Sequence, residues 1–496
     1  MLLSELLQRA GLDTAAPAHE IEIAGVTDSS GEVAPGWLFV AIPGVAVDGH
    51  GFIPEAVRKG AAAVLGSQDS PAGLDGTPYV RTAAPRRALA LLLHAFHGFP
   101  MRDMLVVGIT GTNGKSTTAY LVESILAAAG RKTGLVGTVE YRYGQVRDVA
   151  AHTTPHPLVL VRYASEMRQA GVDALVMEVS SHALTQDRVL GIPFRVGVLT
   201  NVTQDHFDYH QTREAYIEAK WTFFGEVLPR QPGGVAVFNL DDEVGRAFHH
   251  RYTGPALTYG CDPAAALRAT GMESDPSGIR FTLAWENTSY DVRSQLCGDY
   301  NVANVLAALA AGVAAGVPME TVLAGVEDLA GVPGRFERVH AGAPFEIYVD
   351  FAHTPAALDH MLASARRLVG AGGRLLCIFG AGGNRDQSKR GPMGAAVARY
   401  ADRAIITKDN CRLEDPARIA AALAAGIESV PQRRGTYDII LDRREAIRTL
   451  LAEARPGDLV MIAGKGHELY EYEAGEMRPW DDRREIREIL RQLTGL

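Results

Sequence analysis

Cysteine is scarce in this chain of 496 residues, which contains only Cys261, Cys297, Cys377 and Cys411. These residues lie far apart and lack the close pairs that zinc sites and redox motifs require. Their spacing excludes a disulfide scaffold and favours a reducing compartment. We therefore expect a cytoplasmic protein.

Long apolar runs and basic clusters are also missing. No run approaches the roughly 18 apolar residues of a membrane helix, and the N-terminus lacks the basic-then-apolar pattern of a signal peptide. The net charge of −9, without a basic cluster, argues against a nucleic acid partner. The length and the 47% hydrophobic content suit about three domains. We expect a monomer with no membrane span.

The most informative stretch runs from Gly108 to Thr118 (GITGTNGKSTT), between an apolar run at 104–107 and a helical pattern at 119–129. A buried strand, a glycine-rich turn and a helix form a cradle in which backbone N–H groups bind phosphate. Lys115 can reach the terminal phosphates, and the Ser116 hydroxyl can bind Mg²⁺. Ile109 stands where the common phosphate loop has its first glycine, so an ordinary glycine-rich turn is the alternative. We predict a nucleoside triphosphate site that includes Gly111, Thr112, Asn113, Gly114, Lys115, Ser116 and Thr117.

Two further apolar runs, 174–177 and 196–199, have the composition of strands buried on both faces of a parallel sheet. Polar residues follow each run, notably Glu178 after the first and His206 after the second. Ligands of open α/β sheets bind at the carboxyl ends of strands, so both side chains should lie near the phosphate loop. They are candidate ligands for a metal that bridges the triphosphate. A capped turn and a structural histidine are the alternatives.

A helix is predicted over Glu214–Phe224, and Lys220 lies in the middle of its apolar face. The residues three or four positions away are Tyr216, Ile217, Phe223 and Phe224. A bare ammonium group there costs several kcal/mol unless it is paired. Lys220 therefore either extends to the rim of the face or is held near a metal centre.

From about residue 336 onward, strands alternate with helices, which predicts a second doubly wound sheet. The predicted strands are Glu346–Val349, Leu375–Phe379, Ala404–Thr407, Ile439–Leu441 and Leu459–Ile462. Clusters of charged residues follow most of these strands and offer cations for a carboxylate and anions for an amine, as an amino acid site needs. The predicted fold class is α/β with three domains: a smaller N-terminal α/β domain (1–100), a central parallel sheet of the phosphate-loop type (101–335) and a C-terminal Rossmann-like domain (336–496).

Several motifs together resemble one family, the Mur ligases of cell-wall synthesis, and specifically the branch that adds the third residue of the peptide. The resemblance covers essentially the whole chain. It rests on Asp28-Ser29, the loop from Gly111 to Ser116, Thr153-Thr154-Pro155, Glu178–His182, Asp205-His206, Glu218–Trp221, Gly334-Arg335, Asp350–Pro355, Asp409–Arg412 and Gly464–Glu468.

The resemblance implies a role for each domain: the first binds the uridine nucleotide, the second ATP and the third an amino acid. It implies contacts to the UDP-sugar dipeptide from Ser29, Thr153, Thr154, Ser180, Gln186 and Arg188. Further ATP contacts would come from Asn301, Arg335 and Asp350, and the amino acid pocket from Arg390, Asp409, Asn410, Arg412, Gly464 and Glu468. Mg²⁺ would be bound by Ser116, Glu178, His206 and Lys220, the last as N6-carboxylysine, so the expected catalytic residues are Lys115, Glu178, His206 and Lys220.

The implied reaction is ATP-dependent addition of a diamino acid to UDP-N-acetylmuramoyl-L-alanyl-D-glutamate through an acyl phosphate, in peptidoglycan synthesis. Asn410 and Arg412 follow the pattern of enzymes that use meso-2,6-diaminopimelate, whereas Cys411 replaces the usual proline. Ser30 and His152 also depart from the common pattern. Because Cys411 departs from the motif, L-lysine and L-ornithine, which lack the distal carboxylate, stay as alternatives. More distant alternatives are a ligase resembling folylpolyglutamate or cyanophycin synthetase, and a nucleotide-binding switch without ligation.

Overall fold

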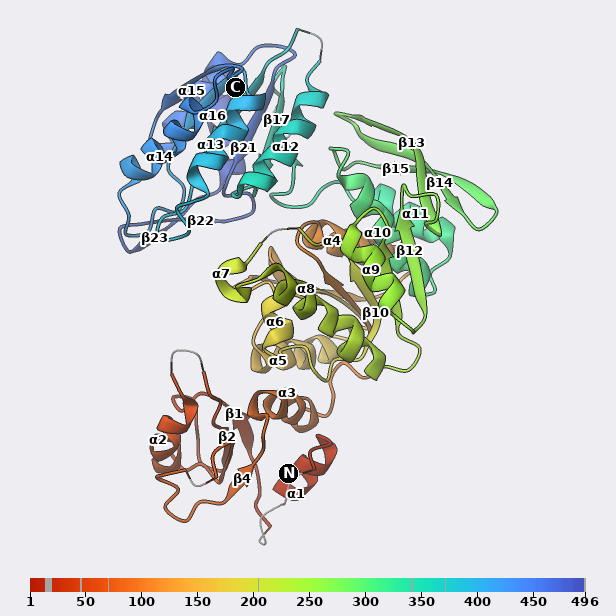
Figure 1. The fold of residues 1–496 in the computed structure, drawn as a ribbon, viewed down its shortest axis with the longest axis vertical. Coiled ribbons are helices and arrows are strands. Elements are labelled where there is room, and N and C mark those ends of the chain that lie inside the picture. The colour runs from red at the N-terminus through yellow and green to blue at the C-terminus, as the bar shows by residue number, and fades with distance from the viewer. Residues whose placement is uncertain are drawn as a thin grey trace. The chain divides into compact units, whose positions relative to one another are not determined.

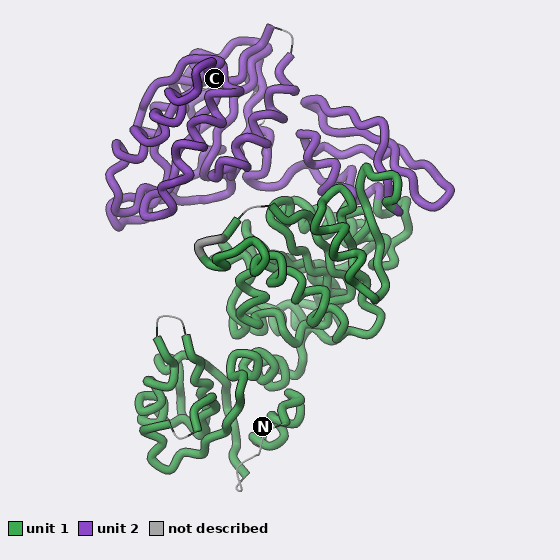
Figure 2. Tube along the Cα trace, in the orientation of Figure 1, with its two compact units in different colours: residues 1–265, 307–322 green, residues 266–306, 323–496 purple. Residues whose placement is uncertain are grey.

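The computed structural model describes residues 1–13, 20–44, 47–69, 71–203, 205–339, 342–370 and 372–494. The chain forms two compact units (Figure 2). Unit 1 comprises Met1–Ala265 and Ala307–Val322, and unit 2 comprises Ala266–Leu306 and Leu323–Leu496. The domain limits at residues 100 and 335 stay predictions from the sequence.

The N-terminal part of unit 1 is a small α/β layer structure with a four-stranded parallel sheet. Alternate residues of its second strand enter two different cores, because Leu38 packs with the helix residue Leu92 whereas Phe39 packs with Ile53 on the other face. Both faces are therefore covered. Its elements are α1 (Leu3–Arg9), β1 (Gly25–Thr27), β2 (Trp37–Val40), η1 (Gly49–Phe52), α2 (Ile53–Arg58), β3 (Ala63–Gly66), β4 (Tyr79–Arg81) and α3 (Pro85–Phe96).

The rest of unit 1 is built on a sheet with the strand order β12-β11-β10-β5-β9-β6-β7-β8. Figure 1 labels β10 and β12 of this sheet. Its strands are β5 (Leu105–Thr110), β6 (Thr133–Val136), β7 (Glu140–Tyr143), β8 (Val146–Val149), β9 (Ala174–Glu178), β10 (Phe194–Leu199), β11 (Val235–Asn239) and β12 (Ala256–Gly260). The strands from β12 to β6 are parallel, and β7 and β8 add an antiparallel edge. Because β5 lies between β10 and β9, the turns that follow these three strands are neighbours. The prediction of a central parallel sheet is confirmed.

The helices of this region are α4 (Lys115–Ala128), α5 (Pro157–Gln169), α6 (Ser181–Thr185), α7 (Phe207–His210), α8 (Arg213–Thr222) and α9 (Glu243–Arg251), followed along the chain by α10 (Asn301–Ala314) and α11 (Met319–Asp328). Two predicted helix limits differ from the observed ones. The helix after the phosphate loop begins at Lys115 rather than Ala119, because the loop itself supplies the first helical turn. The helix around Lys220 changes at Phe223 into a π-helical turn, η2 (Phe223–Val227), and ends in η3 (Leu228–Arg230).

Unit 2 contains a six-stranded sheet with the order β16-β17-β21-β18-β19-β20, parallel except for the edge strand β16. Its strands are β16 (Glu337–Arg338), β17 (Glu346–Asp350), β18 (Leu375–Phe379), β19 (Arg403–Ile406), β20 (Thr436–Ile439) and β21 (Leu459–Ala463). The helices are α12 (Pro355–Leu368), α13 (Arg390–Tyr400), α14 (Pro416–Glu428), α15 (Arg443–Glu453) and α16 (Asp482–Thr494). The prediction of a second doubly wound sheet is confirmed.

Unit 2 also contains the antiparallel strands β13 (Leu267–Asp275), β14 (Gly278–Trp285) and β15 (Thr288–Ser294), and the hairpin β22 (Tyr470–Glu473) and β23 (Glu476–Pro479). The predicted limits of the strand Ile439–Leu441 were wrong. The observed strand is β20 (Thr436–Ile439), which shares only Ile439 with the prediction. This edge strand is largely exposed, so its hydrophobic pattern is weak. Within the part of the chain that the structure describes, no helix is long and apolar enough to cross a membrane.

Candidate functional site

The turn between β5 and α4 has the backbone geometry of a phosphate-binding loop. Gly111 has φ +149°, and a Cβ atom at this position would overlap the hydroxyl of Thr200. Gly114 has φ +84° and is the N-cap of α4. The first N–H groups of α4 and the positive end of its dipole lie at this turn. The loop can therefore bind an anion through its backbone.

Residues that follow β10 anchor the loop. The N–H of Asn113 donates to Asn201 Oδ1 at 3.0 Å, and Thr200 Oγ1 donates to the carbonyl of Asn113 at 2.6 Å. The N–H of Thr112 donates to the carbonyl of Asn201 at 2.8 Å. The segments that follow β5 and β10 are therefore in contact, as expected for neighbouring parallel strands. We did not predict Thr200 as a site residue, although it directly follows the last residue of β10.

The side chain of Lys115 folds over its own loop. Its Nζ atom donates to the carbonyls of Gly111 at 3.0 Å and Thr112 at 2.9 Å. Ser116 and Thr117 are buried in the first turn of α4. Lys115 therefore lies where it can contact phosphate bound by the loop.

Lys220 does not extend to the rim of its helix, because its side chain is only 1% exposed. Its Nζ donates to the carbonyl of Gly111 at 2.9 Å and lies 4.6 Å from the ring centroid of Tyr216. The Tyr216 hydroxyl is 3.0 Å from Thr112 Oγ1. Burial, reinforced by the charge of Lys115, lowers the pKa of Lys220 well below its ordinary value. The structure thus places a readily deprotonated amine against the phosphate loop.

Glu178 ends β9 and is fully buried. Its Oε1 atom accepts from the N–H of Thr138 at 2.8 Å, and its Oε2 atom accepts from Thr138 Oγ1 at 2.9 Å. An ionised carboxylate can accept about four bonds, so these two contacts leave capacity for a cation. Thr138, which follows β6, was not predicted as a site residue.

His206 has φ +56° and is partly exposed. Its ring lies 3.5 Å from Asp205 Oδ2, and its centroid is 4.8 Å from that of His182. Among the described residues, no group of three or more His, Cys, Asp or Glu side chains is arranged to hold a metal. A metal bound here would need further ligands, as Mg²⁺ does when it is bound through substrate phosphates.

The residues predicted to contact the sugar dipeptide form a connected group beside Glu178. Thr154 Oγ1 donates to the carbonyl of Glu178 at 2.8 Å and accepts from the N–H of Ser180 at 3.0 Å. Arg188 donates to the carbonyl of Thr154 at 2.8 Å and to Gln186 Oε1 at 2.7 Å. In addition, Thr153 Oγ1 lies 3.0 Å from Thr138 Oγ1.

Ser29, the remaining residue of that prediction, lies just beyond β1 in the N-terminal sheet region. Its N–H donates to Thr27 Oγ1 at 3.0 Å. The adjacent Asp28 has a carboxylate oxygen 3.1 Å from His156 Nε2. No hydrogen bond among the described residues joins the Ser29 side chain to the group around Thr154.

Two of the three further residues predicted for ATP lie together in unit 2. Asp350 is buried and accepts from the N–H groups of Phe336 and Ala352, each at 2.7 Å. Its pKa is raised by burial, an effect that the nearby Arg335 opposes. The Arg335 guanidinium lies 4.9 Å from the ring centroid of Phe351.

Asn301 is the third of these residues, and both the nitrogen and the oxygen of its side-chain amide are hydrogen-bonded. Its Nδ2 donates to the carbonyl of Cys297 at 2.7 Å, and its Oδ1 accepts from Asn304 Nδ2 at 2.8 Å. In this arrangement the amide supports the start of α10. The ATP contact of Asn301 stays a prediction.

Four residues of the predicted amino acid pocket meet at the carboxyl ends of β19 and β21. Asn410 Nδ2 donates to Glu468 Oε2 at 2.7 Å. A Cβ atom on Gly464 would lie 2.8 Å from Asp409 Oδ2, so these two loops are in close contact. Burial, together with the charge of Asp409, raises the pKa of Glu468 to about 7.

The two predicted arginines differ in their partners. Arg390 is buried and binds Glu414 through two parallel contacts of 2.7 and 2.8 Å, so Glu414 is a partner that sequence reasoning missed. Arg412 has φ +55° and donates to the carbonyl of Gly383 at 2.8 Å. Across the described ranges, Arg412 has no ion-pair partner, so a substrate carboxylate can bind it without displacing a protein carboxylate.

A phosphate loop with a buried lysine against it, and a second α/β sheet with a cluster of charged residues at its strand ends, define a class of nucleotide-dependent α/β enzymes. Family models match three segments: "Mur ligase family, catalytic domain" at 22–97, "Mur ligase middle domain" at 109–312 and "Mur ligase, glutamate ligase domain" at 334–466. The chain belongs to the Mur ligase family.

Curated relatives extend this likeness over the whole chain. The UDP-N-acetylmuramoyl-L-alanyl-D-glutamate–2,6-diaminopimelate ligase of Streptomyces coelicolor is 42% identical, covering 99% of this chain and 97% of its own. The ligase of the same name from Bacillus cereus is 41% identical, covering 96% and 95%.

Solved structures agree with this assignment. A structure of a UDP-N-acetylmuramoyl-L-alanyl-D-glutamate–2,6-diaminopimelate ligase matches with a TM-score of 0.72 and 29% identity over 100% of both chains. MurF ligase from Thermotoga maritima, solved in complex with ADP, matches with a TM-score of 0.59 and 19% identity over 94% of this chain and 97% of that chain, a likeness of fold alone.

Proposed function

We propose that this chain is an ATP-dependent, ADP-forming ligase that joins meso-2,6-diaminopimelate to UDP-N-acetylmuramoyl-L-alanyl-D-glutamate in peptidoglycan synthesis. The observation that carries the proposal is the contact of the buried Lys220 amine with the phosphate loop at Gly111. The names of the relatives and the pocket around Asn410, Arg412 and Glu468 support the choice of substrates.

In the first step, the D-glutamyl carboxylate attacks the γ-phosphorus of ATP, and ADP leaves as the acyl phosphate forms. Catalysis of such a step depends on positioning and on neutralising charge. The N–H groups at the start of α4 and the ammonium of Lys115 would bind the phosphates. The group around Thr154 and Arg188 would hold the dipeptide end of the acceptor substrate.

We propose that Lys220 is carbamylated. Its neutral amine would attack CO₂ and lose a proton, which converts a buried base into an anion. Glu178, His206, Ser116 and the carbamate would then supply oxygen and nitrogen ligands for Mg²⁺, together with phosphate oxygens. Bound Mg²⁺ would neutralise the developing charge on the transferred phosphoryl group.

In the second step, the amine of the diamino acid attacks the acyl carbon, and phosphate leaves from the tetrahedral intermediate. His353 is the candidate base: its Nδ1 lies 2.8 Å from the carbonyl of Phe351, which leaves Nε2 as the acceptor when Nδ1 carries the proton. Burial lowers the pKa of His353, so the neutral form that can accept a proton predominates.

Binding of the diamino acid should depend on pH through Glu468. The pKa of about 7 means that Glu468 is mostly neutral at pH 6 and mostly ionised at pH 8. An ammonium group binds the ionised form better, so we expect the KM for the diamino acid to fall about tenfold over this range. Initial rates at several pH values would measure this change. Glu468→Gln should flatten the profile, and an equally steep profile in that variant would assign the titration to another group.

Parallel ligation assays with diaminopimelate, L-lysine and L-ornithine test the proposed substrate. Arg412 has a cationic head that a second carboxylate can bind, so diaminopimelate should be used best. Arg412→Ala should lower kcat/KM for diaminopimelate about 10- to 100-fold and lysine use much less, since one charge-assisted contact contributes about 1.5–3 kcal/mol. Arg418→Ala, an exposed arginine on α14, is the matched control. Preference for lysine or ornithine, or glutamate addition to a folate, would overturn the assignment.

A further inference from the structure

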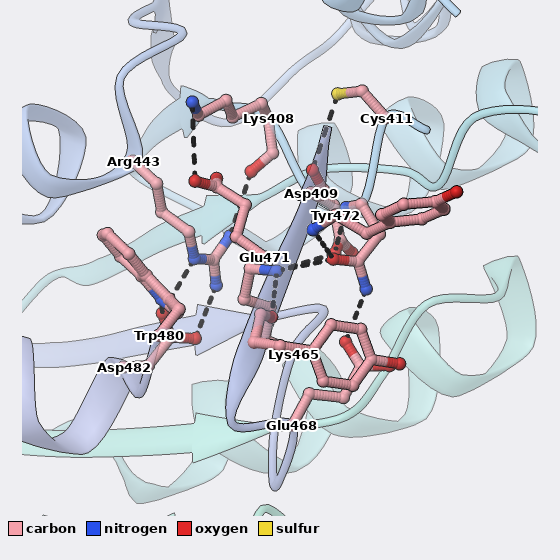
Figure 3. Close-up of polar contacts among 12 residues, drawn as sticks. Lys408, Asp409, Cys411, Arg443, Lys465, Glu468, Glu471, Tyr472, Trp480 and Asp482 are labelled. Atoms are coloured by element: carbon pink, nitrogen blue, oxygen red, sulfur yellow. Dashed lines mark hydrogen bonds and ion pairs between the residues drawn. The ribbon is translucent and has the colours of Figure 1, made fainter. Parts of the chain in front are cut away.

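Lys465 is a fully buried lysine directly after Gly464, and the reaction described above does not use it. Its Nζ donates to Asn410 Oδ1 at 2.9 Å and to the carbonyl of Tyr470 at 3.0 Å. The carboxylate of Asp409 lies 3.7 Å away. Figure 3 shows the Lys465 side chain among Asp409, Tyr472 and Glu468, with dashed lines at its amine.

The surroundings of Asn410 fix the orientation of its amide. Lys465 and the N–H of Tyr472, which donates at 2.9 Å, both face Oδ1. An ammonium group and a backbone N–H can only donate, so the carbonyl end of the amide must face them. The NH₂ end then faces Glu468, to which it donates at 2.7 Å. A flipped amide would set the Asn410 NH₂ against two donors and its oxygen against a carboxylate.

We propose that Lys465 is a positioning residue for the diamino acid pocket: it holds the Asn410 amide in the one orientation that fixes the Glu468 carboxylate. This inference rests on the proposed function, because it assigns Glu468 to the incoming amino acid. Lys465 itself need not touch the substrate. Its effect should therefore appear in the binding of the diamino acid rather than in the binding of ATP.

The charges around Glu468 support this role. Burial and then the charge of Asp409 raise the pKa of Glu468, whereas Lys465, Asn410 and the Tyr470 hydroxyl, 3.4 Å from Oε1, lower it. Lys465 is thus the cation that offsets the repulsion between the two carboxylates. Loss of its charge should raise the pKa of Glu468 above about 7.

A different buried cation holds the backbone of the same loops. Arg443 pairs with Asp482 at 2.6 Å and donates to the carbonyl of Lys408 at 3.4 Å (Figure 3). It also donates to the carbonyl of Ala463 at 3.2 Å. These carbonyls directly precede Gly464 and Asp409. Because Arg443 ties the two loops together, Lys465 can be replaced while this anchor is retained.

The test compares Lys465→Met and Lys465→Gln in the full-length enzyme. Methionine removes both donor and charge, whereas glutamine keeps one donor for Asn410 Oδ1. We expect Lys465→Met to raise the KM for diaminopimelate at least about tenfold and to move its pH dependence to higher pH by about one unit. Lys465→Gln should raise the KM for diaminopimelate by a smaller factor. The KM values for ATP and the UDP-dipeptide should change less than about threefold.

Lys408→Met is the matched control, because this lysine pairs with Glu471 and Glu473 of the hairpin rather than with Asn410. Lys408→Met should not shift the pH dependence of the KM for diaminopimelate. In an Asn410→Ala background, Lys465→Met should raise the KM by a smaller factor than in the wild-type background, because the contact through Asn410 is already lost and only the charge effect on Glu468 is left. Equal effects in both backgrounds, or an unchanged profile in Lys465→Met and Lys465→Gln, would overturn the inference. Failure of the wild-type enzyme to use diaminopimelate would instead overturn the proposed substrate.

Discussion

Replacing Lys220 with alanine should lower ligation by about a thousandfold or more, with partial recovery when bicarbonate or a short-chain carboxylic acid is added. The side chain is buried, its amine contacts the carbonyl of Gly111, and burial lowers its pKa. The amine is therefore suited to react with CO₂, and the resulting anion would be a metal ligand that alanine cannot replace. A small acid that diffuses into the vacated space would restore part of the negative charge.

Initial rates of ADP formation that depend on both the dipeptide and the amino acid would measure the loss. Lys132→Ala is the control, because Lys132 is exposed and lies in the same unit. Wild-type enzyme in bicarbonate-free buffer should lose activity, and the alanine variant should lose only the part of its rate that bicarbonate had restored. A ¹³C signal of a carbamate in labelled bicarbonate would identify the modification. Full activity of Lys220→Ala would dismiss the carbamate role.

Glu178→Gln should lower kcat by at least about a hundredfold and raise the Mg²⁺ concentration needed for half-maximal rate. The substitution keeps the shape of the side chain beside Thr138 but removes the negative charge of a metal-ligand candidate. A neutral amide binds Mg²⁺ much less well than a carboxylate. Rates measured over a series of Mg²⁺ concentrations would report both effects.

Thr138→Val tests how much of the effect of Glu178 depends on its hydrogen bond with the Thr138 hydroxyl rather than on its charge. This variant removes the hydroxyl contact at 2.9 Å but keeps the carboxylate side chain of Glu178, so we expect a smaller loss of kcat, about tenfold. Glu123→Gln makes the same substitution at another buried glutamate, one paired with Arg142, and should not change the Mg²⁺ dependence. If Glu178→Gln and Thr138→Val lost activity equally, with no change in Mg²⁺ dependence, Glu178 would be a structural partner of Thr138.

The phosphate loop could be located from the sequence because its geometry is encoded locally. Gly111 and Gly114 adopt backbone angles that favour glycine, and both lie between an apolar strand and a helix that adjoin them in the chain. The doubly wound sheet of unit 2 was predictable for the same reason, since β17, β18, β19 and β21 are short, mainly apolar runs in which at most the first residue is not buried. The edge strand β20 was misplaced, because an exposed edge carries little of that pattern.

The partners of the charged side chains could not be predicted in this way. Glu414 forms an ion pair with Arg390, and Thr138 donates to both oxygens of Glu178, yet the residues of neither pair are close in the chain. The apolar face around Lys220 left two conformations open, one extending to the rim and one held inside. The structure decided in favour of burial.

By itself, the sequence determined that the chain would form parallel α/β sheets, with a phosphate loop at Gly111–Ser116 and polar residues at the ends of the strands. Short-range periodicity and glycine positions carry that information, because they act between residues that are neighbours in the chain. Only the tertiary structure decided that Lys220 reaches Gly111, 109 positions earlier, and that Lys465 orients Asn410. Such contacts depend on the order in which strands pair, which local patterns do not specify.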